Sequence, residues 1–118
     1  MKKVLVTDDS IMMRESLKTI LIKNDYQIIG EAVNGIEAIN KYRELKPDIV
    51  TMDINMPEMD GISALKKIRE FDPECKVVMI STLGQESYVR EAILSGAKGF
   101  IVKPPQEDVI IKTLNKIQ

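Results

Sequence analysis

Charged and hydroxyl side chains follow four apolar runs of this chain, each at the point where the run ends. These side chains are Asp8 and Asp9 after residues 3–7, Asp53 after residues 48–52, Ser81 and Thr82 after residues 76–80, and Lys103 after residues 98–102. If the runs are parallel strands of one sheet, their carboxyl ends open on one edge, which is where ligands bind in open α/β sheets. We therefore expect three acids, a hydroxyl group and one lysine to converge in one shallow cleft.

The charges of this predicted cluster require a cation. Three carboxylates and one lysine leave two negative charges unbalanced, and packing them together repels at several kcal/mol. A divalent ion removes the imbalance, and oxygen ligands without nitrogen or sulfur suit Mg²⁺, or Mn²⁺ in its place. The chain has no histidine and a single cysteine, Cys75, which excludes the usual zinc sites, histidine-based acid–base catalysis and an internal disulfide.

A cation beside a carboxylate and a lysine suits a phosphoryl group, because phosphoryl transfer depends on positioning and on neutralising oxygens. Asp53 would be the nucleophile, while Asp9 and, less directly, Asp8 would hold the metal. Lys103 would neutralise a phosphoryl oxygen, and the Ser81 hydroxyl would donate a hydrogen bond to it. Each residue has a simpler alternative, since the acids could cap helices or a turn and the lysine could be solvated. Their combination favours the phosphoryl site.

The segments between these residues predict an α/β protein. Alternating or continuous apolar runs predict five strands, at residues 3–7, 27–32, 48–52, 76–80 and 98–102. Helical spacing predicts five helices, with apolar positions Met13, Leu17, Ile20 and Leu21; Ile36, Ile39, Tyr42 and Leu45; Ile62, Leu65 and Ile68; Val89, Ala92 and Ile93; and Ile110, Leu114 and Ile117. Ser10 is the predicted cap of the first helix. Five βα units imply a parallel sheet with right-handed crossovers and helices on both faces, in an order that the pattern leaves open.

Composition limits the class of protein further. The chain has 118 residues, 44% of them hydrophobic, which is typical of one domain with one core. Its 17 basic and 18 acidic residues leave a formal charge of −1 without a basic block, which argues against direct binding of nucleic acid. No signal-peptide pattern opens the chain, and nowhere do about 18 apolar residues follow one another. We expect a cytoplasmic protein that does not enter a membrane.

Four motifs together resemble the receiver domain of two-component response regulators in order and spacing. They are Val6-Thr7-Asp8-Asp9-Ser10, Met52-Asp53-Ile54-Asn55-Met56-Pro57 with Asp60-Gly61, Ile80-Ser81-Thr82, and Phe100-Ile101-Val102-Lys103-Pro104. The resemblance covers essentially the whole chain. It implies one receiver domain over residues 1–118, without an output domain, and the flavodoxin-like (βα)5 fold with strand order 2-1-3-4-5.

The resemblance also implies the roles of individual residues. Asp53 would accept a phosphoryl group from a sensor histidine kinase. Mg²⁺ would bind Asp9, Asp53 and the backbone carbonyl of Asn55, and the Lys103-Pro104 bond would be cis. Receivers often have Ala after the hydroxyl residue of the fourth strand, where this chain has Thr82, so either Ser81 or Thr82 faces the phosphoryl group.

Within this family, residues 9–14, 47–53 and 96–104 are most similar to single-domain regulators of chemotaxis. The similarity implies a monomer that is not itself an enzyme, with a chemotaxis-type kinase, a flagellar motor switch protein and a phosphatase as partners. Ser81 and Phe100 would be switch residues, although Phe100 replaces the more common Tyr and could equally be plain core. The partner face would contain Tyr88, Ala97, Lys98 and Phe100.

Three rival interpretations share parts of this pattern. Asp53-Ile54-Asn55 resembles the Asp-x-Asp of haloacid-dehalogenase-type phosphatases, but Asn55 cannot protonate a leaving group. A flavodoxin-like cofactor binder would need a phosphate-cradling loop where Asp8 and Asp9 would repel phosphate. The sequence also allows a phosphorelay carrier, or the receiver of a longer regulator such as the chemotaxis methylesterase, as the main alternative to a free-standing regulator.

Overall fold

The computed structural model describes residues 1–117, in which five strands alternate with five helices; the predicted domain limit at Gln118 lies outside this range. The strands are β1 (Lys3–Thr7), β2 (Gln27–Ala32), β3 (Ile49–Met52), β4 (Val77–Ser81) and β5 (Gly99–Val102). The helices are α1 (Ile11–Lys23), α2 (Gly35–Leu45), α3 (Gly61–Phe71), α4 (Glu86–Leu94) and α5 (Glu107–Ile117). All strand pairs are parallel in the order β2-β1-β3-β4-β5, which confirms the predicted flavodoxin-like fold.

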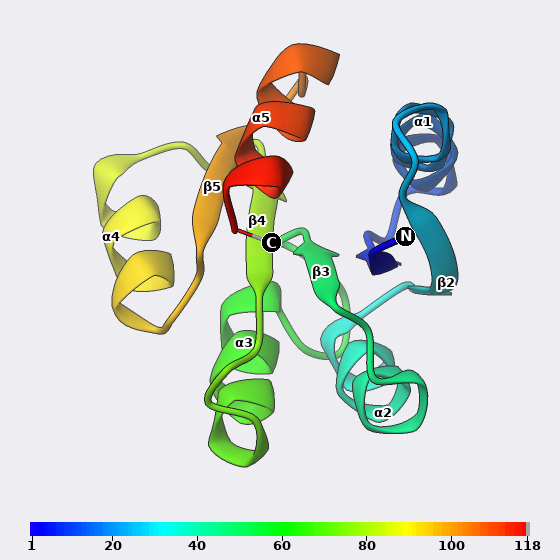
Figure 1. Ribbon diagram of the computed structural model, residues 1–118. Helices are drawn as coiled ribbons and strands as arrows, with labels where there is room; N and C mark the ends of the chain where they lie inside the picture. Colours follow the sequence, from blue (N-terminus) through cyan, green and yellow to red (C-terminus); the bar gives the residue numbers. More distant parts are fainter. Residues whose placement is uncertain (118) are drawn as a thin grey trace.

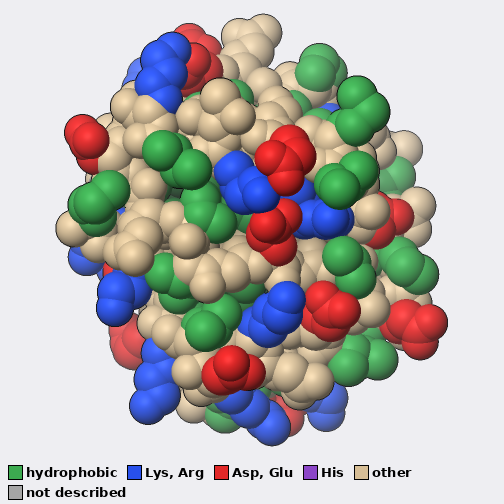
Figure 2. All heavy atoms as spheres, turned by 90° about the vertical axis from the view of Figure 1, so that its right-hand side faces the viewer, with side chains coloured by type: hydrophobic (Ala, Val, Ile, Leu, Met, Phe, Trp, Pro, Cys, Tyr) green, Lys and Arg blue, Asp and Glu red, His purple; other side chains and the backbone are tan. Residues whose placement is uncertain are grey.

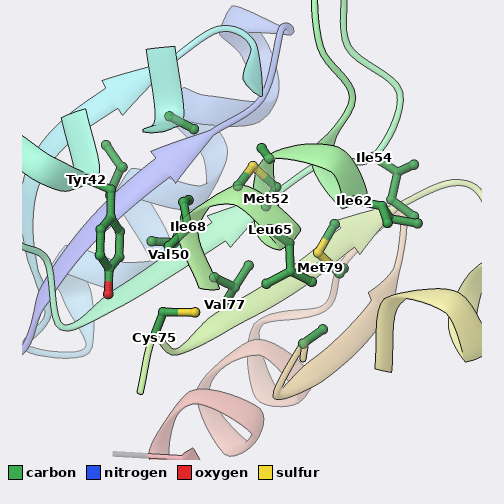
Figure 3. Packing of buried hydrophobic residues seen from close by; sticks show 14 of the residues in the cluster. Tyr42, Val50, Met52, Ile54, Ile62, Leu65, Ile68, Cys75, Val77 and Met79 are labelled. Atoms are coloured by element: carbon green, nitrogen blue, oxygen red, sulfur yellow. The ribbon is translucent and has the colours of Figure 1, made fainter. Parts of the chain in front are cut away.

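Helices cover both faces of the sheet (Figure 1). Leu17 and Leu21 of α1 pack with Ile110 and Leu114 of α5 on one face, while α2, α3 and α4 cover the other. Successive strand residues point to opposite faces, so each strand contributes to both cores. Figure 3 shows the core on the α3 side, where strand side chains meet those of the helix. Because both faces are covered, polar groups gather at the strand ends.

Side-chain caps fix where three of the helices begin. The Ser10 hydroxyl accepts from the N–H of Met13, as predicted, and Asn34 and Asp60 make the equivalent bonds for α2 and α3. The first turn of α4 follows Gln85, whose side chain makes no such bond. The only buried residue of α4 is Ala92. Within residues 1–117, α4 is therefore the helix with the fewest buried residues.

Two apolar positions predicted to face the core are exposed instead. Ile36 of α2 is 44% exposed and Ile93 of α4 is 47% exposed. The buried faces of these helices consist mainly of small residues, with Gly35 and Ala38 in α2 and Ala92 in α4. Small side chains let a helix lie close to the sheet, so the larger residues beside them remain in solvent.

The loop between β3 and α3 packs so closely that Gly61 has no room for a side chain. A Cβ on Gly61 would lie 1.9 Å from the backbone oxygen of Asp53 and 2.9 Å from Cγ of Met52. The N–H of Gly61 also donates to the carbonyl of Ile54 at 2.7 Å. The first residue of α3 is therefore held against the backbone of Asp53.

We predict that Gly61→Ala forces this loop away from Asp53 and lowers the free energy of unfolding by about 1–3 kcal/mol, the usual cost of overpacking. Urea denaturation measures the loss, and amide NMR shifts around Asp53 report the displacement. Gly84→Ala is the control, because its Cβ would meet only the exposed Val102 side chain, at 3.0 Å or more. Equal losses in the two variants would show that the Gly61 contact is unimportant.

Candidate functional site

The carboxyl ends of two neighbouring strands bring three carboxylates together. The register pairs Thr7 of β1 with Met52 of β3, so Asp8 and Asp53 follow at adjacent positions. One oxygen from each of Asp8, Asp9 and Asp53 lies within 4.8 Å of the others. Asp8 and Asp53 are buried, whereas Asp9 is exposed. The structure thus forms the acid trio that the sequence predicts.

Lys103 reaches this trio from the end of β5. Its Nζ lies 2.7 Å from Oδ2 of Asp8 and 3.4 Å from Oδ2 of Asp53. The lysine side chain is only 12% exposed, so the alternative of a solvated charge is wrong. The Lys103-Pro104 peptide is cis, as predicted. Residues 95 positions apart in sequence therefore form the shortest ion pair of the site.

The helix-cap alternative for the first two acids is wrong as well. Ser10 caps α1, and Oδ1 of Asp8 instead accepts from the N–H of Ser10 at 2.9 Å. Asp53 does make a local bond, since its Oδ1 accepts from the N–H of Ile54 at 2.9 Å. Its other oxygen, Oδ2, faces Lys103. Asp8 and Asp53 thus each accept a backbone N–H with one carboxylate oxygen, while the other oxygen faces Lys103.

The electrostatics of the trio oppose ionisation of Asp53. Burial raises the pKa of Asp53 above its usual value; Lys103 lowers it, and the neighbouring charge of Asp8 raises it again, with a net upward shift. One lysine does not balance three carboxylates. An all-oxygen donor set with excess negative charge fits a hard divalent cation such as Mg²⁺ or Mn²⁺. The residues present therefore suit the metal that the sequence implies.

The two hydroxyl candidates differ in their surroundings. Ser81 is the last residue of β4 and is buried, and its Oγ accepts from the N–H of Leu83 at 3.1 Å. Thr82 is exposed. Asn55 lies in the loop between β3 and α3 and is also exposed. Coordination by its backbone carbonyl stays a prediction.

The residues of the predicted partner face are not equally accessible. Tyr88 is 37% exposed and Lys98 is exposed, whereas Ala97 is buried in the core and Phe100 is partly buried against it. A groove of about 330 Å³ runs beside Phe100 between β5 and α5. Its lining includes Lys98, Phe100, Val109, Lys112, Lys116 and Ile117.

Sequence reasoning missed two lysines of this groove. Lys112 and Lys116 lie four positions apart on α5, a spacing that places them on one helix face. That spacing was a usable signal, although only the packing of α5 beside β5 puts the pair next to Lys98. Three lysines with an apolar floor make this groove suited to an acidic ligand.

A flavodoxin-like sheet with an acid trio and a lysine at its carboxyl edge defines a class of phosphoacceptor signalling domains. The chain belongs to the response regulator receiver domain family, which it matches over residues 4–115. It is 54% identical over 116 residues to the chemotaxis protein CheY of Thermotoga maritima, an alignment that covers 98% of this chain and 97% of that protein. It is accordingly a CheY-like signalling protein and not a catalytic enzyme.

Solved structures agree with this assignment. A chain in the crystal structure of the CheX–CheY–BeF3–Mg²⁺ complex from Borrelia burgdorferi has a TM-score of 0.96 and 41% identity, covering 98% of this chain and 88% of that chain. The response regulator domain of Thermotoga maritima CheB has a TM-score of 0.87 and 42% identity, covering 98% and 92%. Within residues 1–117, none of the helices is long and apolar enough to cross a membrane.

Ionised Asp53 is buried and lies beside the negative charge of Asp8. We therefore predict that Asp53→Asn stabilises the metal-free protein at pH 7. The gain should be on the order of 1 kcal/mol, because burial of the charged carboxylate is the main cause of the raised pKa and the attraction of Lys103 offsets the repulsion of Asp8. Urea denaturation measures it. Asp25→Asn, at an exposed position, is the control.

The pH dependence follows from the raised pKa of Asp53 in the folded state. The folded state favours the protonated acid, so the destabilisation is absent below the pKa of the unfolded chain and complete above that of the folded protein. The advantage of Asp53→Asn should grow as pH rises through the folded-state pKa, and millimolar Mg²⁺ should reduce it. A variant less stable than the wild type at pH 7 would contradict this account.

Proposed function

We propose that this protein is a response regulator that accepts a phosphoryl group on Asp53 from a sensor histidine kinase and then changes its partner binding. One observation carries the proposal: Lys103 faces Asp53 at 3.4 Å within a trio of carboxylates that needs a cation. The 54% identity to a chemotaxis protein CheY supports the same assignment.

Phosphorylation would proceed at the carboxyl edge of the sheet. Asp53 attacks the phosphorus of a phosphohistidine, a P–O bond forms, and the P–N bond to the kinase breaks. Mg²⁺, or Mn²⁺ in its place, held by Asp9, Asp53 and the carbonyl of Asn55, with Asp8 less directly, would offset charge on the phosphoryl oxygens. Lys103 leaves Asp8 and pairs with one of those oxygens.

The proposed switch starts at Ser81. Its hydroxyl turns to donate to the phosphoryl group, which disturbs the bond that it accepts from the N–H of Leu83. The segment that moves leads into α4, where Ala92 is the only buried residue. Phe100 pairs in register with Met79 of β4 and is only partly buried, so it can turn into space that the segment vacates. The change at Asp53 thereby reaches β5.

The proposed output surface consists of Tyr88, Lys98 and Phe100, with the buried Ala97 directly before Lys98. The lysine-lined groove beside Phe100 complements an acidic peptide by charge and offers apolar contacts to it. We assign this surface to a flagellar motor switch protein.

A chemotaxis-type kinase and a phosphatase complete the partners, the latter because the Borrelia burgdorferi structure pairs CheY with CheX. We further propose a cytoplasmic monomer in which one receiver accounts for residues 1–118.

A second function rests on a specific likeness. The response regulator domain of Thermotoga maritima CheB matches this chain at 42% identity, so a receiver that controls an attached output domain is the main alternative. A phosphorelay carrier would use the same Asp53 chemistry. Both alternatives keep the phosphoacceptor and change only what reads it.

We predict that acetyl phosphate with Mg²⁺ adds one phosphate to the chain, at Asp53, because that carboxylate is a proposed metal ligand and also faces Lys103 at 3.4 Å. Intact-mass spectrometry detects the addition, which should vanish when Mg²⁺ is chelated. Asp25→Asn should be labelled like the wild type. Full labelling of Asp53→Asn would refute the assignment of the phosphoacceptor.

We also predict that beryllofluoride tightens binding of an acidic motor switch peptide about tenfold, which needs only a modest population shift. NMR titration should move the resonances of Tyr88, Lys98 and Phe100. Lys103→Ala should still accept phosphate but fail to show the tightening, because the lysine links the phosphoryl group to β5. Equal affinity in both states, or shifts confined to α1, would remove the motor-binding function and leave the phosphoacceptor chemistry intact.

A further inference from the structure

Arg14 connects the acid trio to an edge strand of the sheet. Its Nη1 donates to the backbone oxygen of Asp8 at 2.8 Å, and its Nε donates to Oε1 of Glu31 at 2.9 Å. Glu31 lies on β2, which ends the sheet on that side. The Arg14 side chain is only 12% exposed, so it is confined between the two partners. The phosphotransfer steps above give this arginine no role.

The bond to Asp8 lies where the sheet stops holding the backbone. The β1 ladder ends at Thr7, and the N–H of Asp8 still donates to the carbonyl of Ala32. The carbonyl of Asp8 lies beyond the ladder, and Arg14 supplies the donor that the next strand position would have supplied. Both polar groups of the Asp8 backbone are thereby fixed.

This fixed carbonyl sets the direction of Asp9. The carbonyl of Asp8 and the N–H of Asp9 belong to one planar peptide unit, so fixing the first fixes the second. Within residues 1–117, the Asp9 carboxylate makes no hydrogen bond or ion pair of its own. Its orientation toward Asp53 therefore depends on the backbone that Arg14 holds.

Glu31 both orients Arg14 and balances its charge. Its Oε2 also accepts from Lys18 at 2.8 Å, and Lys41 donates to its backbone carbonyl. Lys18 first, and Arg14 after it, hold the pKa of Glu31 below its usual value, so the carboxylate is charged at neutral pH. Acidic and basic side chains meet on the face formed by α1, β2 and α2 (Figure 2). Lys18 also pairs with Glu15 at 2.8 Å, so two bases and two acids balance, and the guanidinium lies beside the acid trio without a net charge that repels a cation.

We propose that Arg14, oriented by Glu31, is a positioning residue that holds Asp9 in the orientation that binds the divalent cation. The inference rests on the metal site of the proposed function. Because Glu31 lies on β2, this edge strand then also contributes to the affinity of the site for the metal. If Arg14 positions Asp9, its replacement weakens cation binding. If Arg14 acted only through its positive charge, loss of that charge would strengthen cation binding.

The test measures Mn²⁺ affinity of the full, unphosphorylated chain from the electron paramagnetic resonance signal of free Mn²⁺. Arg14→Lys keeps the charge but cannot make both N–H bonds in the same geometry, and it should weaken binding about tenfold, as loss of outer-shell partners of metal ligands does. Lys18→Gln is the matched control. It removes a positive charge from the same cluster without touching Asp8, and should change the affinity less than about twofold.

Two further variants separate positioning from a loss of stability. Glu31→Ala frees Arg14 and should also weaken Mn²⁺ binding, and the double variant should bind no more weakly than Arg14→Lys alone, since Glu31 acts through Arg14. Urea denaturation shows the fraction of each variant that is folded. The amide NMR shift that Mg²⁺ induces at Asp9 should shrink in Arg14→Lys and persist in Lys18→Gln.

Wild-type affinity in Arg14→Lys would overturn the inference alone, and so would tighter binding in Arg14→Gln, which would mark a charge effect. Additive losses in the double variant would also overturn it, because Glu31 would then act independently. A wild-type chain that binds no Mn²⁺ would overturn both this inference and the metal-dependent function on which it rests.

Discussion

Repulsion among three carboxylates at one edge of the sheet is the constraint on which the rest of this structure depends. Asp8 and Asp53 are buried beside exposed Asp9, and Lys103 alone does not neutralise them. The site is thus held in an unfavourable ionisation state that a cation, and then a phosphoryl group with a cation, can relieve. That excess charge suits the site to a divalent cation, and the proposed phosphoryl group would bind together with this cation.

The fold withstands this repulsion because the acids are attached to strands that are buried on both faces. Apolar side chains of α1 and α5 on one side, and of α2 and α3 on the other, fix β1 and β3 in place. The loop after Asp53 is fixed as well, through the close approach of Gly61. The backbone is therefore held in place at Asp8 and Asp53, and these two buried acids stay close together.

Helix α4, beside β5, is the less tightly packed part of the domain. Lys103 follows β5, and the N–H of Leu83 ties the segment before α4 to Ser81. Helix α4 has a single buried residue and no side-chain cap, so a change at Ser81 meets little resistance there. A domain that is rigid at β1 and β3 and loosely packed at α4 can convert a local change of charge into a change of surface.

Local periodicity and turn chemistry were enough to predict the alternation of five strands and five helices, the acids, hydroxyl and lysine at the strand ends, and the cap at Ser10. The strand order came from resemblance to a family, not from the pattern. The exposure of Ile36 and Ile93 became clear only from the three-dimensional packing, since it depends on how closely the small residues beside them approach the sheet. The packing also decided that Lys103 pairs with Asp8 and that Arg14 holds the Asp8 carbonyl. These contacts join residues whose proximity arises from strand register and crossover packing, and no local pattern in the chain encodes that proximity.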